Sequence, residues 1–271
     1  MEIEDIEISI DEIEIVPQLA PGLLSVAPAK RVQRKELRVT HQPGFVLHSY
    51  PYKETSLIID LFSRDFGRVS LVAKGAKRPH SKLRSVLQTF QPLTVAWSGK
   101  AEVRTLTGAE WVGGMLPLEK SALLCGFYLN ELLTKFLLRH EASQVLFDHY
   151  VATLNQLAHG ESATIALRKF ELVLLQQSGL MGDITTCHQS GTRVQTEKWY
   201  VLDPSSGVRA AFESDTVPKI LGKTLIDMES GSYSDPVTQS QSKQLMRFLL
   251  HHHLHGQALK TRQILIDLQK L

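Results

Sequence analysis

The chain has 271 residues, of which 43% are hydrophobic and 21% charged, enough apolar material for one large domain or two to three small ones. No run of about 18 or more apolar residues occurs, which argues against a membrane span, and the acidic first residues do not resemble a secretory signal. The two cysteines, Cys125 and Cys187, do not make a disulfide framework. Together these features predict a cytoplasmic protein.

The formal net charge of +2 conceals a strong asymmetry along the chain. Residues 1–29 carry seven acids and neither Lys nor Arg, so residues 30–271 carry +9. Ile alternates with these acids up to Ile15, but dense like charge opposes strand pairing, and the prolines that follow are typical of a linker. We therefore predict a mostly disordered acidic leader over residues 1–38. The basic remainder favours a polyanionic partner over a charge excess that merely aids solubility.

Five short β-rich runs follow the leader. They are RVTHQPGFVLHSY, SLIIDLFS, GRVSLVAKGA, LTVAWSG and EVRTLTGAEWV. Short turns or a basic stretch separate them, and no long helical pattern interrupts them. Five strands in so short a segment predict a small closed barrel over residues 39–116. The strand count favours an OB-fold, and an SH3-like barrel is the competing interpretation.

After Pro117 the apolar residues recur every three or four positions, which is typical of helices. We predict helices over about 118–140, 143–158, 164–177, 218–227, 240–255 and 259–271. Residues 182–212 lose this periodicity and predict an irregular β insert. The expected fold class is therefore α+β and multidomain. An OB-fold barrel precedes an α-helical domain, residues 117–271, which carries the small insert.

Residues 74–84 contain five cations and no acid. Because Gly75, Pro79 and Ser81 lie among them, we predict a loop that follows a phosphate backbone without reading base identity. Alternation predicts Phe45 in the core, whereas Tyr52 is a candidate for an exposed ring on which a base can stack. The alternative is a solvated loop over core aromatics. The predicted nucleic-acid contacts are Tyr52, Lys53, Arg68, Lys74, Lys77, Arg78, Lys82, Arg84, Lys100 and Arg104.

Two features raise the question of a metal. Cys187-His188 is at most half of a zinc site, because a structural zinc needs four ligands and no second cysteine pair follows. His251 and His255 have the i, i+4 spacing of metal ligands, but no Glu stands between them as in a metalloprotease helix. We interpret them as surface histidines, and a metal-dependent enzyme built on His251–His255 is the rival hypothesis. Cys125 lies on the apolar face of a helix and is predicted to be core.

No nucleophile elbow, phosphate-binding glycine loop or dinucleotide motif occurs in the chain. Catalytic groups that are dispersed along a chain leave no such motif. The sequence nevertheless predicts a binding protein with no catalytic residues, no metal and no cofactor.

The segment FVLHSYPYKETSLIIDLFSRDFGRVSLVAKGAKRPHSKL resembles the N-terminal OB domain of the RecO family of bacterial DNA repair proteins. YLNELLTKFL, LRKFELVLLQQSGL and ALKTRQIL resemble the helical segments of that family in matching order. The resemblance covers about residues 43–270 and leaves the acidic leader outside. It implies an OB domain, a helical domain and a zinc-ribbon-like insert whose cysteines only some members keep. TTCHQSG keeps one, Cys187, so we do not expect the zinc of the family in this chain.

The resemblance also implies a function without bond chemistry at the bacterial nucleoid. The family binds single- and double-stranded DNA, anneals complementary strands coated with the single-stranded DNA-binding protein SSB, and joins RecR in loading RecA. Its helical domain binds the acidic C-terminal tail of SSB. The motif L-R-[RK]-F-E-L places this contact on Arg168, near Phe170, and the motif L-K-[ST]-R adds Lys260 and Arg262. A generic OB-fold DNA- or RNA-binding module without a mediator role is the alternative.

Overall fold

The computed structural model describes residues 38–268, and the side chains of residues 265–268 are not part of this description. Apart from Arg38, the predicted acidic leader lies outside the described residues. None of the helices within the described range is long and apolar enough to cross a membrane.

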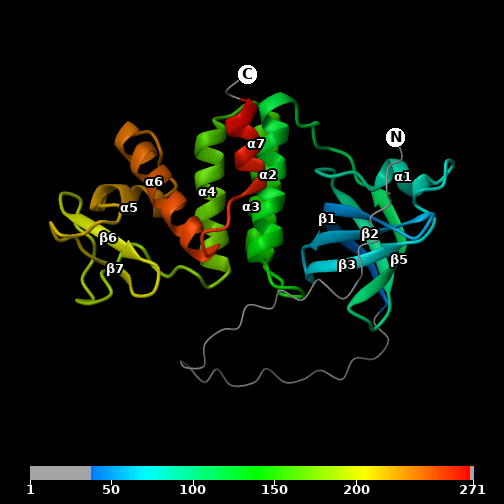
Figure 1. The fold of residues 1–271 in the computed structure, drawn as a ribbon, viewed down its shortest axis with the longest axis horizontal. Helices are drawn as coiled ribbons and strands as arrows, with labels where there is room; N and C mark the ends of the chain where they lie inside the picture. The colour runs from blue at the N-terminus through cyan, green and yellow to red at the C-terminus, as the bar shows by residue number, and fades with distance from the viewer. Residues whose placement is uncertain (1–37, 269–271) are drawn as a thin grey trace, which may run out of the picture. The chain divides into compact units, whose positions relative to one another are not determined.

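Five strands form a closed barrel in the first part of the described chain (Figure 1). They are β1 Val39–Tyr52, β2 Ser56–Ser63, β3 Gly67–Ala73, β4 Leu93–Ser98 and β5 Val103–Trp111. The strand order around the barrel is β1-β2-β3-β5-β4. The β3–β5 pair is parallel, and the other pairs are antiparallel. The five predicted strands are confirmed, and the barrel is an OB-fold rather than an SH3-like barrel.

The alternating side chains of the strands account for the barrel interior, since every second residue of a strand faces the same side. Leu61, Leu71 and Val95 are buried in this core together with Trp97, whose ring meets that of Phe66 at a centroid distance of 5.3 Å. A register shift between Val46 and His48 interrupts the pairing of β1 with β2. Such bulges re-aim side chains.

Gly67, at the β2–β3 turn, has a φ of 63°, and a Cβ at this position would collide with the backbone carbonyl of Glu141. We expect Gly67→Ala to destabilise the protein by at least about 2 kcal/mol, because the left-handed conformation and the collision both oppose a side chain. Gly160 is the matched control, since its φ is 75° but no atom lies within 4 Å of a Cβ there. Gly160→Ala should cost about 1 kcal/mol. Urea denaturation measures both, and equal effects would contradict the close packing at Gly67.

The remainder of the described chain is largely helical. Its helices are α2 Lys120–Phe136, α3 Gln144–Ala158, α4 Ala163–Gln177, α5 Gly222–Glu229, α6 Pro236–His253 and α7 Lys260–Leu268. Figure 1 shows α7 alongside α2, and these two helices are in contact. The predicted start of α6 is four residues late, because Asp235 caps the helix by accepting a hydrogen bond from the Val237 backbone N–H at 2.9 Å.

A small antiparallel sheet lies between α4 and α6 in the chain. Its strands are β6 Trp199–Asp203, β7 Gly207–Ala210 and β8 Ile220–Leu221, in the order β7-β6-β8. The predicted small β insert is confirmed, and residues 182–198 form no named strand. The sheet extends beyond residue 212, because β8 occupies residues that we assigned to a helix over 218–227, so that α5 begins only at Gly222.

The barrel and the helices share buried contacts. Phe45 and Phe62 leave the barrel wall to pack against Phe147 and Tyr150 of α3, with ring centroids 5.2–5.7 Å apart. Asn130 of α2 donates to the backbone carbonyl of Leu47 at 2.9 Å and accepts from the Tyr150 hydroxyl at 2.6 Å. The core position predicted for Phe45 is confirmed, but the core that it joins is the one built by the helices.

Candidate functional site

Two cationic surfaces stand out, and the first is the basic segment, residues 74–84. Its five cations Lys74, Lys77, Arg78, Lys82 and Arg84 are all exposed. Within the part of the chain that the structure describes, none of them is in an ion pair. The prediction of a loop is correct only for the first part, because the short helix α1 Lys82–Val86 carries the last two cations.

Backbone hydrogen bonds fix the basic segment to the barrel. The Lys77 backbone N–H donates to the Thr55 carbonyl in the β1–β2 turn at 2.9 Å, and the Ala76 N–H donates to the Ala73 carbonyl at the end of β3 at 3.4 Å. Lys77 and Arg84 both line a shallow hollow of about 430 Å³ at the barrel rim. Two of the five cations therefore border an open depression, where a phosphate backbone can approach both.

The other predicted nucleic-acid contacts fall into two groups. Lys53 and Lys100 are exposed in the β1–β2 and β4–β5 turns, and the Lys53 ammonium lies 5.4 Å from the ring centroid of the half-buried Tyr52. Arg68 and Arg104 are withdrawn from solvent. The half-buried Arg68 guanidinium donates to the Thr134 carbonyl of α2, and burial lowers its pKa. Arg104 is only 8% exposed, so we leave both out of the candidate surface.

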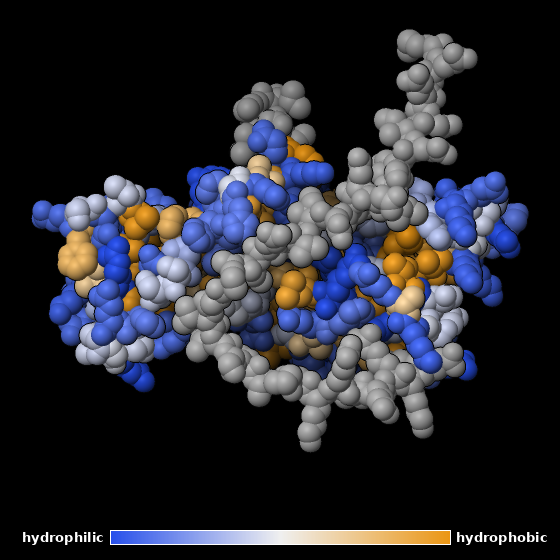
Figure 2. All heavy atoms as spheres, turned by 60° about the horizontal axis from the view of Figure 1, so that its bottom comes forward, coloured by the Kyte–Doolittle hydropathy of each residue, from blue (hydrophilic) through white to orange (hydrophobic). Residues whose placement is uncertain are grey.

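Most of the face drawn in Figure 2 is hydrophilic, and apolar side chains gather over the barrel, at the right of that view. Base faces are apolar and phosphates are charged, so a nucleic-acid strand uses both kinds of surface.

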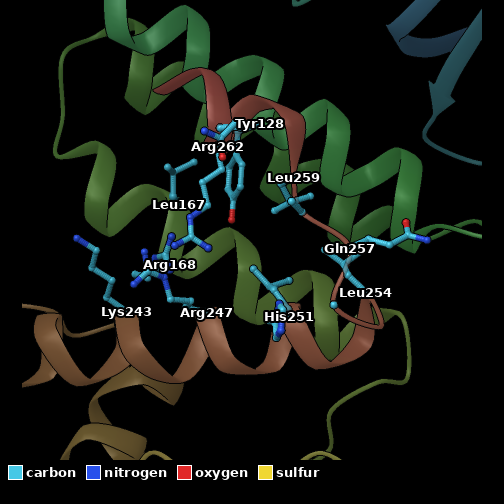
Figure 3. Close-up of a pocket in the computed structure, with 14 residues that line it drawn as sticks. Tyr128, Leu167, Arg168, Lys243, Arg247, His251, Leu254, Gln257, Leu259 and Arg262 are labelled. Atoms are coloured by element: carbon cyan, nitrogen blue, oxygen red, sulfur yellow. The ribbon is translucent and has the colours of Figure 1, made fainter. Parts of the chain in front are cut away.

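The second surface is a pocket of about 380 Å³ among α2, α4, α6 and the residues around the start of α7 (Figure 3). Its apolar part comes from leucines on three segments, and cations surround it. The residues that define this cationic pocket are Leu167, Arg168, Lys243, Arg247, Leu250, His251, Leu254, Leu259 and Arg262, together with the ring of Tyr128. Figure 3 shows Arg168 and Arg247 close together at one side of it.

A buried carboxylate holds the inner wall of the cationic pocket. Glu171 is fully buried, forms an ion pair with Arg168, and accepts a hydrogen bond from the Tyr128 hydroxyl at 2.6 Å. Burial raises the pKa of Glu171, while the Arg168 guanidinium acts in the opposite direction. Arg168 is therefore held in one orientation with only 13% of its side chain exposed. It can offer its outer edge to an anion.

The structure brings together only some of the residues that were predicted to bind the SSB tail peptide. Arg168 and Arg262 line the cationic pocket, but Phe170 is fully buried in the helical core. Lys260 is exposed outside the lining, at the start of α7, where the Glu131 carboxylate accepts from the backbone N–H groups of Lys260 and Thr261 at 2.8 and 2.9 Å. Burial removes Phe170 from direct peptide contact.

Sequence reasoning missed the contribution of α6. Lys243, Arg247 and His251 follow one another at intervals of four residues and line the cationic pocket from one helix face. The i, i+4, i+8 spacing of three basic side chains was a detectable signal.

The insert does not suit the zinc that the resemblance implies for some members. Cys187 is buried and hydrogen-bonded to Ser190, which lowers its pKa. The turn that faces it contains Asp203, whose Oδ1 accepts from the Ser205 backbone N–H, the Ser205 hydroxyl and the Ser206 N–H at 2.9, 2.6 and 3.0 Å. Among the described residues no group of three or more His, Cys, Asp or Glu side chains is placed to hold a metal.

We expect the purified protein to hold no stoichiometric zinc, because Cys187 and Asp203 are engaged by neighbouring hydroxyl and amide groups rather than aimed at a shared centre. Elemental analysis after dialysis against a chelator measures this. About one zinc per chain retained after dialysis would overturn the expectation.

The barrel topology defines an OB-fold protein, and comparison with known proteins places it in DNA repair and recombination. The family description "Recombination protein O N terminal" matches residues 37–115, and "Recombination protein O C terminal" matches residues 119–263. The chain belongs to the RecO family. The resemblance found in the sequence is thereby confirmed.

Similar curated proteins carry the name "DNA repair protein RecO". One from Ralstonia nicotianae is 60% identical over 92% of this chain and 93% of its own length. One from Burkholderia pseudomallei is 54% identical over 96% of this chain and 99% of its own length. The latter alignment includes part of residues 1–38. The acidic leader therefore lies outside the N-terminal family description but not wholly outside similarity to relatives, which corrects our expectation.

Proposed function

We propose that this protein binds single-stranded DNA, anneals complementary strands coated with SSB, and helps to load RecA together with RecR. Membership of the RecO family and the name of its relatives support a role in DNA repair. The proposal assigns no bond chemistry to the protein. We also retain the sequence-based division into a nucleic-acid-binding domain, residues 39–116, and a helical domain, residues 117–271.

The basic segment, with Lys53 and Lys100 in neighbouring turns, binds DNA backbones in this proposal. Its cations lie on turns and on the first turns of α1, exposed and outside described ion pairs. Contacts of this kind neutralise phosphates and release counterions, whatever the base sequence. Two strands bound near the same cations repel each other less, while their base edges stay free to pair. Double-stranded DNA binds through the same phosphate contacts.

The cationic pocket binds the acidic C-terminal tail of SSB, and this pocket is the observation that carries the mediator role. A generic OB-fold module needs no second cationic surface on its helices. The pocket combines leucine side chains with Arg168, Lys243, Arg247 and Arg262. An acidic peptide that ends in an aromatic residue matches it, because guanidinium groups pair with carboxylates and the leucines receive the ring.

Titration of the protein with the SSB C-terminal peptide tests this role. We expect saturable binding that weakens with salt and that is lost when the terminal aromatic residue of the peptide is replaced by Ala. Absence of peptide binding, with single-stranded DNA binding intact, would favour the generic OB-fold module.

A further inference from the structure

Two aromatic rings stand together on the outer wall of the barrel. His48 and Tyr50 are two residues apart on β1, so their side chains lie on the same face of the strand. Their ring centroids are 4.2 Å apart, with 30° between the ring planes. Both residues are exposed, and Tyr50 retains 43% of its accessible surface. The Ser49 backbone N–H donates to His48 Nδ1 at 2.7 Å, which orients the imidazole.

The row of residues beside Tyr50 carries no charged side chain. The strand register places Ile58, Val72 and Thr105 in a row with Tyr50, and all three are half-buried. In the adjacent row Asp60 is buried and accepts a hydrogen bond from the Ser70 hydroxyl at 2.6 Å. Burial raises the pKa of Tyr50, whereas the nearby guanidinium groups of Arg68 and Arg139 lower it. Arg68 donates to the Thr134 carbonyl and Arg139 is paired with Glu102, so both are already engaged. The wall itself accommodates the flat, apolar face of a base.

Cations lie on the other side of the same strand end. Ser49, between the two ring residues, lines the hollow of about 430 Å³ together with Lys77 and Arg84. The hydrogen bond from Lys77 to Thr55 joins the basic segment to the β1–β2 turn, close to Tyr52 and Lys53. A single DNA strand whose phosphates follow these cations passes the end of β1. From there its bases can reach the rings of His48 and Tyr50.

We propose that His48 and Tyr50 form a base-stacking platform for single-stranded DNA. The proposal rests on the proposed function, since it requires the barrel to bind single strands. A base stacked by its face keeps its pairing edge free, and stacking tolerates every base because each has a π-face. The platform therefore holds bases in a state that is ready to pair with a second strand.

Tyr50→Ala and Tyr50→Phe test the platform in the full chain. We expect Tyr50→Ala to weaken binding of a mixed-sequence single strand about tenfold, within the range for loss of one stacked base, and Tyr50→Phe to bind like the parent. The slope of log affinity against log salt should stay unchanged in both, because no phosphate contact is lost. Binding of duplex DNA should also stay unchanged, since its bases are already stacked on one another.

An oligonucleotide with abasic sites provides the sharpest comparison. The parent should prefer the intact strand to the abasic one about tenfold, and Tyr50→Ala should lose this preference. Phe212→Ala removes another exposed ring, which lies outside the barrel after β7. This control variant should keep the preference for the intact strand. The platform proposal would be overturned if Tyr50→Ala kept the preference for the intact strand, or if Phe212→Ala lost that preference equally. Salt-dependent strand binding through the basic segment would then still stand, so the failure of the platform is distinguishable from failure of the proposed function.

Discussion

Replacing Lys77, Arg78, Lys82 and Arg84 together with Ala should weaken single-strand binding by two to three orders of magnitude near 0.1 M salt, an order-of-magnitude expectation from counterion release. Each phosphate contact to a single strand contributes about 0.7 to the slope of log affinity against log salt, so four lost contacts lower the slope by about 3. The affinities of the parent and the variant for single-stranded DNA should consequently converge as the salt concentration rises. Fluorescence anisotropy of a labelled oligonucleotide across a salt series measures this. Exposed substitutions of this kind rarely change stability by more than about 0.5 kcal/mol.

A charge-matched variant separates local contacts from net charge. Lys120, Lys135, Arg193 and Lys198 are exposed cations outside the barrel, and their replacement by Ala removes the same total charge. This control should change the salt slope little. An unchanged slope in the folded basic-segment variant, or an equal fall in the control, would show that DNA binds elsewhere.

Arg168→Ala should weaken binding of the SSB tail peptide about tenfold or more, because a charge-assisted contact to a carboxylate is worth about 1.5–3 kcal/mol. Binding of naked DNA should change little, since the cationic pocket is separate from the basic segment. Isothermal titration with the peptide and anisotropy with DNA measure the two effects. Peptide binding as tight as that of the parent would show that the tail does not use this pocket.

The ion pair with Glu171 complicates that substitution. Removal of Arg168 leaves a fully buried carboxylate without its partner, which typically costs about 3–5 kcal/mol of stability. Arg247→Ala avoids this loss of stability, because Arg247 is exposed and in no described ion pair. This variant should also weaken binding of the peptide severalfold. Lys260→Ala is the matched control outside the pocket lining and should have the smaller effect. If Lys260→Ala weakened peptide binding more than Arg247→Ala, the peptide would bind on the other side of α7, outside the cationic pocket.

The sequence predicted those parts of the fold that local pattern determines. Short β-rich runs separated by turn residues located all five barrel strands, and three- to four-residue spacing located α2, α3 and α4 to within a few residues. The sequence did not predict elements whose existence depends on tertiary contacts. The strand β8 has only two residues, Ile220 and Leu221, and exists because β6 lies beside it. No periodicity can appear in so short a segment.

The basic segment was predicted from a run of cations that are contiguous in sequence. In the cationic pocket, the resemblance predicted Arg168 and Arg262, whereas the cations of α6 were missed. Lys74 to Arg84 formed one visible run. Arg104 looked like one more surface cation, yet the alternation of β5 places it on the inner side with Leu106. The cationic pocket joins Arg168, Arg247 and Arg262 from three helices, and their proximity depends on the packing of α4, α6 and α7. The resemblance to the RecO family supplied Arg168 and Arg262 but not Arg247, for which the spacing within α6 was the available signal.

Annealing of complementary strands coated with SSB tests the mediator role most directly. The assay compares intact SSB with SSB that lacks its C-terminal tail, using the parent protein and Arg247→Ala. We expect the parent to anneal strands coated with intact SSB and to fail with tail-less SSB. Arg247→Ala should anneal strands coated with intact SSB less well than the parent, in keeping with its weaker peptide binding, yet anneal bare strands normally. Equal annealing of strands coated with intact and with tail-less SSB would contradict the account, because the cationic pocket would then have no part in reaching the coated strand.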